Sequence, residues 1–270
     1  MKVAAGAVVG GGAGLFSLTQ AFKPEIKFDN TPQKLDYKQD ENNWKYSGLD
    51  PVVTAELAYK YYSEGSCMFA IVKSVISQLS EIVGESYTSF PVHLFKYGHG
   101  GVGGYGSVCG TLNGAAALIG LLITDKNIQD KMIADVFRWY EKEPLPSFSP
   151  VSPGYDYVPV KSISNSVLCH ASNANWCKTA GLKVDSKERK ERCRRMTADV
   201  TMKLATSLNE IFENAYITSM QNDETVNSCL TCHGSEGKVN NTAVKMSCNP
   251  CHSESVGHRV FADIHYKMME

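Results

Sequence analysis

The chain has 270 residues, 43% of them hydrophobic, which is enough to bury the core of one large domain or two small ones. Its 27 basic and 28 acidic residues nearly cancel and no long basic run occurs, so nucleic acid is not an expected partner. Nine cysteines are many for this length and point to metal or redox chemistry.

Residues 1–21 have the pattern of a secretory signal peptide. Lys2 is followed by a Gly- and Ala-rich apolar stretch, and Thr19-Gln20-Ala21 is a small-x-small sequence that a signal peptidase can cleave. The stretch is short and weakly hydrophobic, so no stable membrane span is expected, with an uncleaved anchor as the alternative. The positive n-region is minimal, and a twin-arginine motif upstream of Met1 would complete it if the start is assigned too late. We expect export, with a mature chain beginning near Phe22.

The N-terminal half predicts helices after a polar arm. Residues 22–49 are rich in Lys, Asp, Asn and Gln and predict an extended or loosely ordered arm. Asp50 and Pro51 supply a cap and a first-turn proline for a helix to about residue 62. Gly65-Ser66 then interrupts the helix, and residues 67–83 carry a regular apolar stripe that predicts another.

The second half is also predicted to be helical. Residues 108–123 predict a buried helix and residues 125–141 an amphipathic one, and the proline-rich residues 144–159 predict an irregular connection. A helix is expected from Ser186 to about Met220. Charges of both signs between residues 183 and 195, with Glu188/Arg192 and Glu191/Arg195 at i,i+4, predict a solvated helix face. Because no run of alternating β-formers occurs, the fold class is mainly α.

Five cysteines lie in this helical region. Cys67 and Cys109 each begin a predicted helix, Cys193 lies in the first turns of a third, and Cys169 and Cys177 are expected in the loop before it. Helix starts favour the thiolate, which is the form that binds metals. An odd number of cysteines cannot be fully paired as disulfides, so a metal or redox centre is predicted. Packing as small buried hydrophobes is the alternative.

A glycine-rich loop spans residues 98–106 and matches G-x-G-x-x-G twice, from Gly98 and from Gly101. A dinucleotide site would need a preceding strand within a βαβ unit, and none is predicted. The loop is better suited to close backbone approach to a metal cluster, or to tight helix packing.

The C-terminal region carries two C-x-x-C-H motifs, the attachment signature of c-type haem. They are Cys229-Leu-Thr-Cys232-His233 and Cys248-Asn-Pro-Cys251-His252. Two thiols at this spacing can each add to a vinyl group on one porphyrin edge, and the following His then ligates the iron. We therefore predict two covalent haems c, with His233 and His252 as proximal ligands. The same cysteines also fit C-x2-C-x15-C-x2-C, so a zinc site is the alternative, although zinc has no use for the two histidines.

Five further histidines are candidates for the distal positions. His258 and His265 are tethered closest to the motifs, and His99 and His93 could be supplied by a partner subunit. His170, beside Cys169, could instead serve the cysteine site. Met is the usual competitor of His at this position. The surplus of histidines favours closed coordination and an electron carrier, whereas a reductase of a small nitrogen or sulfur species would need an open iron site.

A family resemblance joins these features. Cys67, the sequence Cys109-Gly110-Thr111-Leu-Asn-Gly114, Cys177 and Cys193 resemble a family of redox-active proteins defined by four cysteines and a Cys-Gly-Ala-x-x-Gly motif, over about residues 50–220. Thr111 replaces the Ala, and Cys169 is an additional cysteine. With two haem motifs appended, the whole chain resembles the split-Soret cytochromes c. The resemblance implies a homodimer, a periplasmic location, closely stacked bis-His haems and a second iron centre of the [2Fe-2S] type.

The sequence thus predicts a periplasmic dihaem c-type cytochrome that carries electrons. Its predicted parts are a signal peptide (1–21), an arm (22–49), a helical redox domain (50–220) and an irregular dihaem-binding segment (221–270). Cys67, Cys109, Cys177 and Cys193 are the predicted ligands of one iron–sulfur cluster, with Cys169 as the alternative ligand. Partner redox proteins are not identifiable. A haem-containing reductase and a zinc-binding structural protein are the alternative functions.

Overall fold

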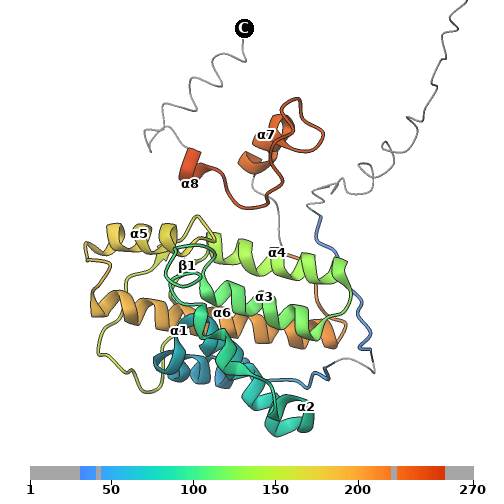
Figure 1. The fold of residues 1–270 in the computed structure, drawn as a ribbon, viewed down its shortest axis with the longest axis vertical. Helices are drawn as coiled ribbons and strands as arrows, with labels where there is room; N and C mark the ends of the chain where they lie inside the picture. Colours follow the sequence, from blue (N-terminus) through green and yellow to red (C-terminus); the bar gives the residue numbers. More distant parts are fainter. Residues whose placement is uncertain (1–30, 41–43, 220–223, 253–270) are drawn as a thin grey trace, which may run out of the picture.

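The protein is described by a computed structural model over residues 31–40, 44–219 and 224–252 (Figure 1). The predicted signal peptide, His258 and His265 lie outside these residues. The fold is mainly α, as predicted. In chain order the elements are α1 (Pro51–Ile82), α2 (Glu85–Thr88), the 3-10 helix η1 (Val92–Tyr97), α3 (Gly110–Leu122), α4 (Lys126–Lys142), β1 (Pro144–Leu145), β2 (Ser162–Ile163), α5 (Cys169–Ala180), α6 (Lys187–Phe212), α7 (Glu224–His233) and α8 (Asn249–His252).

Helix α1 begins where the sequence predicts and contains a sharp kink. The Asp50 carboxylate accepts hydrogen bonds from the N–H groups of Val52 (2.8 Å) and Val53 (3.1 Å), which satisfies two donors at the helix start. Gly65 and Ser66 leave helical geometry, and Ser66 has a positive φ of 66°. The kink divides α1 into the two predicted helices and makes Cys67 the first residue of the second one.

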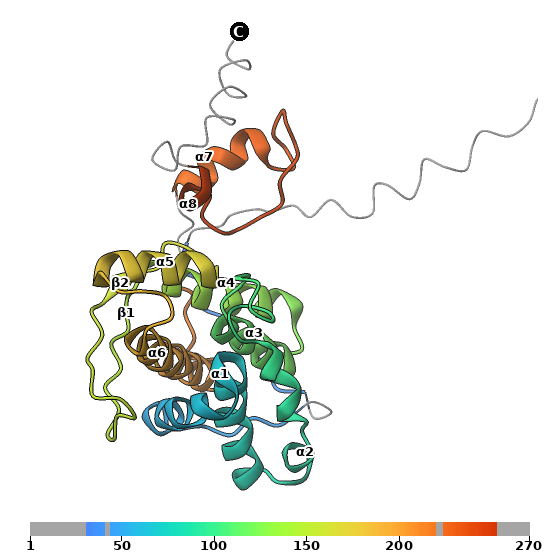
Figure 2. The same ribbon diagram turned by 60° about the vertical axis from the view of Figure 1, so that its left-hand side comes forward.

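Helices α1, α3, α4 and α6 form a bundle, with α1 packed along α6 and α3 against both of them (Figures 1 and 2). The shared core is apolar, and Ile71, Leu112 and Leu204 in it are fully buried. Burial of these stripes is the main stabilisation of the bundle, because each fully buried aliphatic side chain contributes about 1.5–3 kcal/mol.

Helix α6 ends at Phe212, so the predicted extension to about Met220 is wrong. Asn214 adopts a positive φ of 55°, a conformation that Asn tolerates and that terminates helices. The chain then reverses and pairs with the N-terminal arm: Leu35 N–H donates to the Tyr216 carbonyl (3.0 Å), and Thr218 N–H donates to the Gln33 carbonyl (2.9 Å). The described part of the arm is therefore extended but firmly packed, with Leu35 buried in the core.

The predicted solvated face near the start of α6 is buried instead. Glu191, Arg192 and Arg195 are 2%, 0% and 5% exposed. Glu191 and Arg195 pair as the spacing predicts, at 2.7 Å, and Glu191 also accepts from the Tyr59 hydroxyl at 2.8 Å. Arg192 does not pair with Glu188 and turns inward. Glu191 contacts Tyr59 of α1 and Arg192 contacts Ser172 of α5, so these charges lie inside the protein.

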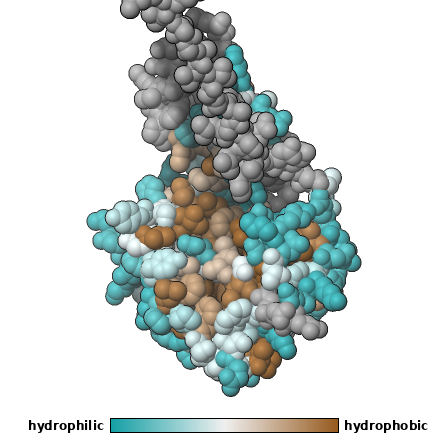
Figure 3. All heavy atoms as spheres, turned by 45° about the vertical axis from the view of Figure 1, so that its right-hand side comes forward, coloured by the Kyte–Doolittle hydropathy of each residue, from teal (hydrophilic) through white to brown (hydrophobic). Residues whose placement is uncertain are grey.

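The described surface is mixed in character. On the face shown in Figure 3, hydrophobic residues form an area framed by hydrophilic ones. Among the described helices, none combines the length and apolarity needed to cross a bilayer.

Candidate redox centres

Four cysteines approach one another where the helices start. Cys67 follows the kink in α1, Cys109 is the N-cap of α3, Cys169 is the first residue of α5, and Cys193 lies in the second turn of α6. The Cys67 thiol interacts electrostatically with the thiols of Cys109, Cys193 and Cys169. The expectation that Cys169 and Cys177 lie in a loop is wrong, because both belong to α5.

Burial controls the acidity of these thiols. Desolvation raises the pKa of Cys67 well above its usual range, and neighbouring thiols raise it further. Desolvation likewise raises the pKa of Cys169 to about 12 and raises the pKa of Cys177. The prediction that a helix start lowers the thiol pKa is therefore wrong for Cys67. A thiolate at this site needs a positive partner, such as a metal, to offset desolvation.

Cys177 lies apart from the other thiols. It is eight residues after Cys169 on α5, which corresponds to a rise of about 12 Å along the helix axis. The Cys193 thiol raises the pKa of Cys177, whereas the thiols of Cys109, Cys193 and Cys169 raise that of Cys67. Cys169 is thus associated with more of the other thiols than Cys177 is.

Within the described ranges, no three His, Cys, Asp or Glu side chains are close enough together to hold a single metal ion. A two-iron cluster is larger than a single ion and separates its ligands more widely, so this finding concerns single-ion sites.

Polar side chains that could not be identified from the sequence form hydrogen-bond contacts with the thiols. The Asn173 amide donates to Cys169 Sγ at 3.2 Å and accepts from Cys193 Sγ at 3.4 Å. Cys67 Sγ lies 3.9 Å from the Tyr62 hydroxyl, which precedes the kink. Asn173 and Tyr62 were not predicted, because only the packing of α5 and α1 brings them to the cysteines.

Arg192 is the most informative neighbour of the site. It is 0% exposed, its Nη1 lies 3.8 Å from Cys193 Sγ, and its Nη2 donates to Ser172 Oγ at 2.8 Å. Its Nε has no hydrogen-bond partner, and no carboxylate in the described part of the chain pairs with it. A buried cation without a counter-ion is costly. The site is therefore suited to a group of negative charge, which an iron–sulfur cluster held by thiolates supplies.

The motif that begins at Cys109 has a packing explanation. A Cβ on Gly110 would lie 2.0 Å from the Gly98 carbonyl oxygen and 3.2 Å from Cys67 Cβ, so only glycine lets the glycine-rich loop and α1 approach Cys109. A Cβ on Gly114 would meet Ile71 at 2.4 Å. Thr111, the departure from Ala, places its hydroxyl 3.0 Å from that of Thr197 on α6.

Each C-x-x-C-H motif coincides with a short helix, so the predicted irregular segment has local order. Cys229 and Cys232 lie one turn apart on α7, which puts both thiols on one face. In the second motif, the N–H groups of Cys251 and His252 donate to the Cys248 carbonyl at 3.2 and 3.0 Å. The second thiol of each motif is exposed.

His233 is held by the loop that follows it. Its Nδ1 lies 2.9 Å from Asn241 Oδ1, and its carbonyl accepts from the N–H groups of Asn241 and Thr242, both at 3.0 Å. Because the amide oxygen only accepts, Nδ1 carries the proton and Nε2 carries the lone pair. This is the tautomer that an iron ligand bound through Nε2 requires.

The other histidines are placed in part. His93 in η1, His99 in the glycine-rich loop and His170 in α5 are exposed. Gly106 contacts His170, whose N–H donates to the Gly106 carbonyl at 3.1 Å. The candidates His258 and His265 lie outside the described residues.

Comparisons with known proteins identify the relatives of this chain. The profile of a family described as "Putative redox-active protein (C_GCAxxG_C_C)" matches residues 71–207. Split-Soret cytochrome c of Desulfovibrio desulfuricans is 36% identical over 217 residues, which cover 78% of this chain and 77% of the relative. A solved structure described as "A novel iron centre in the split-Soret cytochrome c from Desulfovibrio desulfuricans ATCC 27774" matches with a TM-score of 0.72 and 34% identity, covering 78% of this chain and 90% of that chain.

The helical bundle and the cysteines gathered at its helix starts define a redox protein of the mainly α class. With more than two thirds of the relative covered at this identity, the chain belongs to the split-Soret cytochrome c family and is an electron-carrying cytochrome. The predicted family is thereby confirmed.

Proposed function

We propose that this chain is a periplasmic dihaem c-type cytochrome that carries electrons and holds an additional cysteine-bound iron centre. The observation that carries the proposal is the pair of C-x-x-C-H motifs, the first contained in α7 and the second running from Cys248 into α8. The similarity to split-Soret cytochrome c supports it independently.

Different residues of the C-terminal segment would attach the haems and ligate their irons. The four thiols at Cys229, Cys232, Cys248 and Cys251 would form the thioether links, and His233 and His252 would be the proximal ligands. Asn241 holds His233 in the tautomer with its lone pair on Nε2 and increases its basicity. Haem supplies a one-electron couple, and the protein sets its potential through these ligands and their hydrogen bonds.

For the second centre, we propose Cys67, Cys109, Cys169 and Cys193 as the ligand set of a [2Fe-2S] cluster. Their mutual proximity and the unpaired Arg192 beside them support an anionic group at this position. The sequence predicts Cys177 as the fourth ligand with Cys169 as the alternative; this proposal exchanges the two, and Cys177 is kept as the alternative because the family resemblance includes it. The related structure is described as having a novel iron centre, which supports the proposal of an additional iron centre in this chain.

The distal ligands and the assembly belong to the same proposal. We expect bis-His iron in both haems, with His258, His265, His99 and His93 as the candidates. The exposure of His99 and His93 suits ligation across a homodimer. Six-coordinate iron changes charge with little ligand movement, which favours electron transfer over substrate binding.

Haem staining of a denaturing gel tests the proposal, because only covalent haem stays with the unfolded chain. We expect a stained band at the mass of the mature chain, and iron and labile sulfide beyond the haem iron in protein purified without oxygen. An unstained chain that contains zinc would contradict the proposal and favour the zinc alternative. Haem without additional iron would contradict only the second centre.

A further inference from the structure

A buried ion pair on α4 contacts the backbone that leads into the second haem motif. Arg138 Nη1 lies 2.9 Å from Glu141 Oε2, and the two side chains are 5% and 4% exposed. Desolvating such a pair is unfavourable unless further hydrogen bonds use its remaining donors and acceptors. The remaining donors and acceptors of Arg138 and Glu141 therefore need hydrogen-bond partners.

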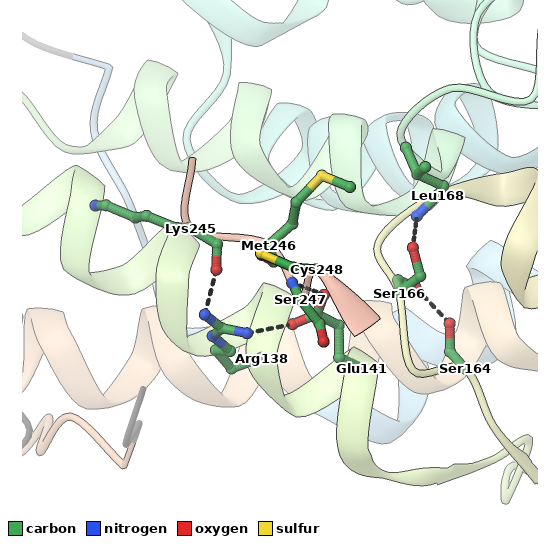
Figure 4. A network of polar contacts seen from close by, with 9 residues as sticks. All are labelled: Arg138, Glu141, Ser164, Ser166, Leu168, Lys245, Met246, Ser247 and Cys248. Atoms are coloured by element: carbon green, nitrogen blue, oxygen red, sulfur yellow. Dashed lines mark hydrogen bonds and ion pairs between the residues drawn. The ribbon is translucent and has the colours of Figure 1, made fainter. Parts of the chain in front are cut away.

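Both remaining arms of the pair bind residues 245–247 (Figure 4). Arg138 Nη2 donates to the Lys245 carbonyl, and Glu141 Oε1 accepts from Ser247 N–H at 3.4 Å. Between these two contacts, Met246 packs against the apolar core of the bundle. The next residue is Cys248, the first thiol of the second motif, and its Sγ lies 4.0 Å from the Met246 carbonyl.

The same turn of α4 anchors the loop that leads to the cysteine site. Asn165 N–H donates to the Glu141 carbonyl at 2.9 Å. Within the loop, Leu168 N–H donates to Ser166 Oγ at 3.1 Å, as drawn in Figure 4. From there Val167 accepts from Cys109 N–H at 2.9 Å, and Cys169 follows Leu168 directly.

Glu141 is thus the residue at which the haem segment and the cysteine loop meet. We propose that Arg138 and Glu141 form a clamp that docks residues 245–248 on α4 and fixes the second haem relative to the cysteine site. Arg138 and Glu141 are positioning residues, since neither would contact haem or cluster. This inference rests on the proposed function for its electron-transfer consequence: a fixed separation between the two centres permits a fixed rate of electron exchange between them.

The test replaces the whole pair, because removing one partner would leave a buried unpaired charge. Arg138→Met combined with Glu141→Leu replaces the pair by apolar side chains of similar volume. Proteins commonly tolerate this replacement of a buried ion pair. The matched control is Lys126→Gln with Asp130→Asn, which removes an exposed ion pair from the same helix. Hydrogen–deuterium exchange of the intact holoprotein is followed by mass spectrometry, together with thermal unfolding, haem potentials and the rate of electron exchange between haem and iron centre.

We expect amides of residues 245–248 to exchange at least about tenfold faster in the Arg138/Glu141 double variant, because two hydrogen bonds to charged groups are lost. Electron exchange should slow in that variant, with unfolding temperature and haem potentials close to wild type. The control should match wild type throughout. If the double variant does not fold, Glu141→Gln decides the question, because its single amide oxygen cannot serve both Arg138 and Ser247.

The proposed clamp would be refuted if the amides of residues 245–248 exchange at the wild-type rate in a folded double variant. The same result in Glu141→Gln would refute it where that variant is needed. Faster exchange with an unchanged rate of electron transfer would overturn its role in setting the separation. Haem content is measured on the same samples. A wild-type chain without covalent haem would contradict the proposed function, while the exchange comparison would still decide whether the clamp exists.

Discussion

Replacing Arg192 by Met should lower the reduction potential of the cysteine-bound iron centre. The guanidinium is fully buried and its Nη1 lies 3.8 Å from Cys193 Sγ. The added electron resides on iron beyond that sulfur, so we take a charge separation of roughly 8 Å. With an effective dielectric constant of about 20, the lost attraction is about 2 kcal/mol, which corresponds to roughly 90 mV for a one-electron couple.

The assay is a redox titration of the holoprotein followed by electron paramagnetic resonance, with the haems as internal references. Arg194→Met is the matched control: it removes a charge two residues along α6, where the guanidinium lies 4.8 Å from the centre of the Tyr59 ring, away from the thiols. It should leave the iron-centre potential near wild type. The same Arg192 substitution should stabilise the metal-free protein, because it removes an unpaired buried charge, and should destabilise the loaded protein. An unchanged potential in Arg192→Met, or an equal shift in Arg194→Met, would refute the reasoning.

Three further predictions concern the ligands. Asn241→Leu should raise the reduction potential of the first haem by about 40 mV, because it removes one hydrogen bond of about 1 kcal/mol that favours the ferric state. Spectroelectrochemical titration measures this shift, and an unchanged potential would exclude Asn241 from tuning His233. Cys169→Ser should remove most of the non-haem iron and sulfide whereas Cys177→Ser should retain them, and the reverse result in iron analysis would restore Cys177 to the ligand set. Ferrous protein should show an unchanged optical spectrum under carbon monoxide, since bis-His iron has no open position, and a clear shift would favour the reductase alternative.

The local features of the fold were predictable from sequence because they depend on neighbouring residues. Asp50 caps α1 as predicted, and Gly65-Ser66 breaks it where the sequence changes character. Cys67 and Cys109 lie at the starts of helical segments, which local sequence also predicted. Cap preferences and glycine conformations act within a few residues, so a single sequence contains the necessary information.

The environment of the cysteine site was not predictable in this way. Arg192 and Glu191 belong to a charge pattern that is typical of a solvated helix, yet both are buried, Glu191 against Tyr59 of α1 and Arg192 against Ser172 of α5. Helix dipoles alone predict acidic thiols, but burial dominates and raises the pKa of Cys67. The position of Cys169 depends on α5 docking beside Cys109, a contact between residues 60 positions apart in the chain. Such tertiary contacts have no local signal in the sequence. The one local indication is that arginines flank Cys193 directly in the chain.

The most direct test of the central claim is the mass of the denatured chain in wild type and in Cys251→Ala. Because thioether links survive unfolding, we predict that wild-type protein carries the mass of two haem groups. A Cys251→Ala chain that folds should retain one haem by two thioether links, at Cys229 and Cys232, with the second haem absent or attached by a single thioether link at Cys248. Wild-type protein with no covalent haem, or a Cys251→Ala chain with two fully linked haems, would contradict the assignment of Cys248-Asn-Pro-Cys251-His252 as a haem site.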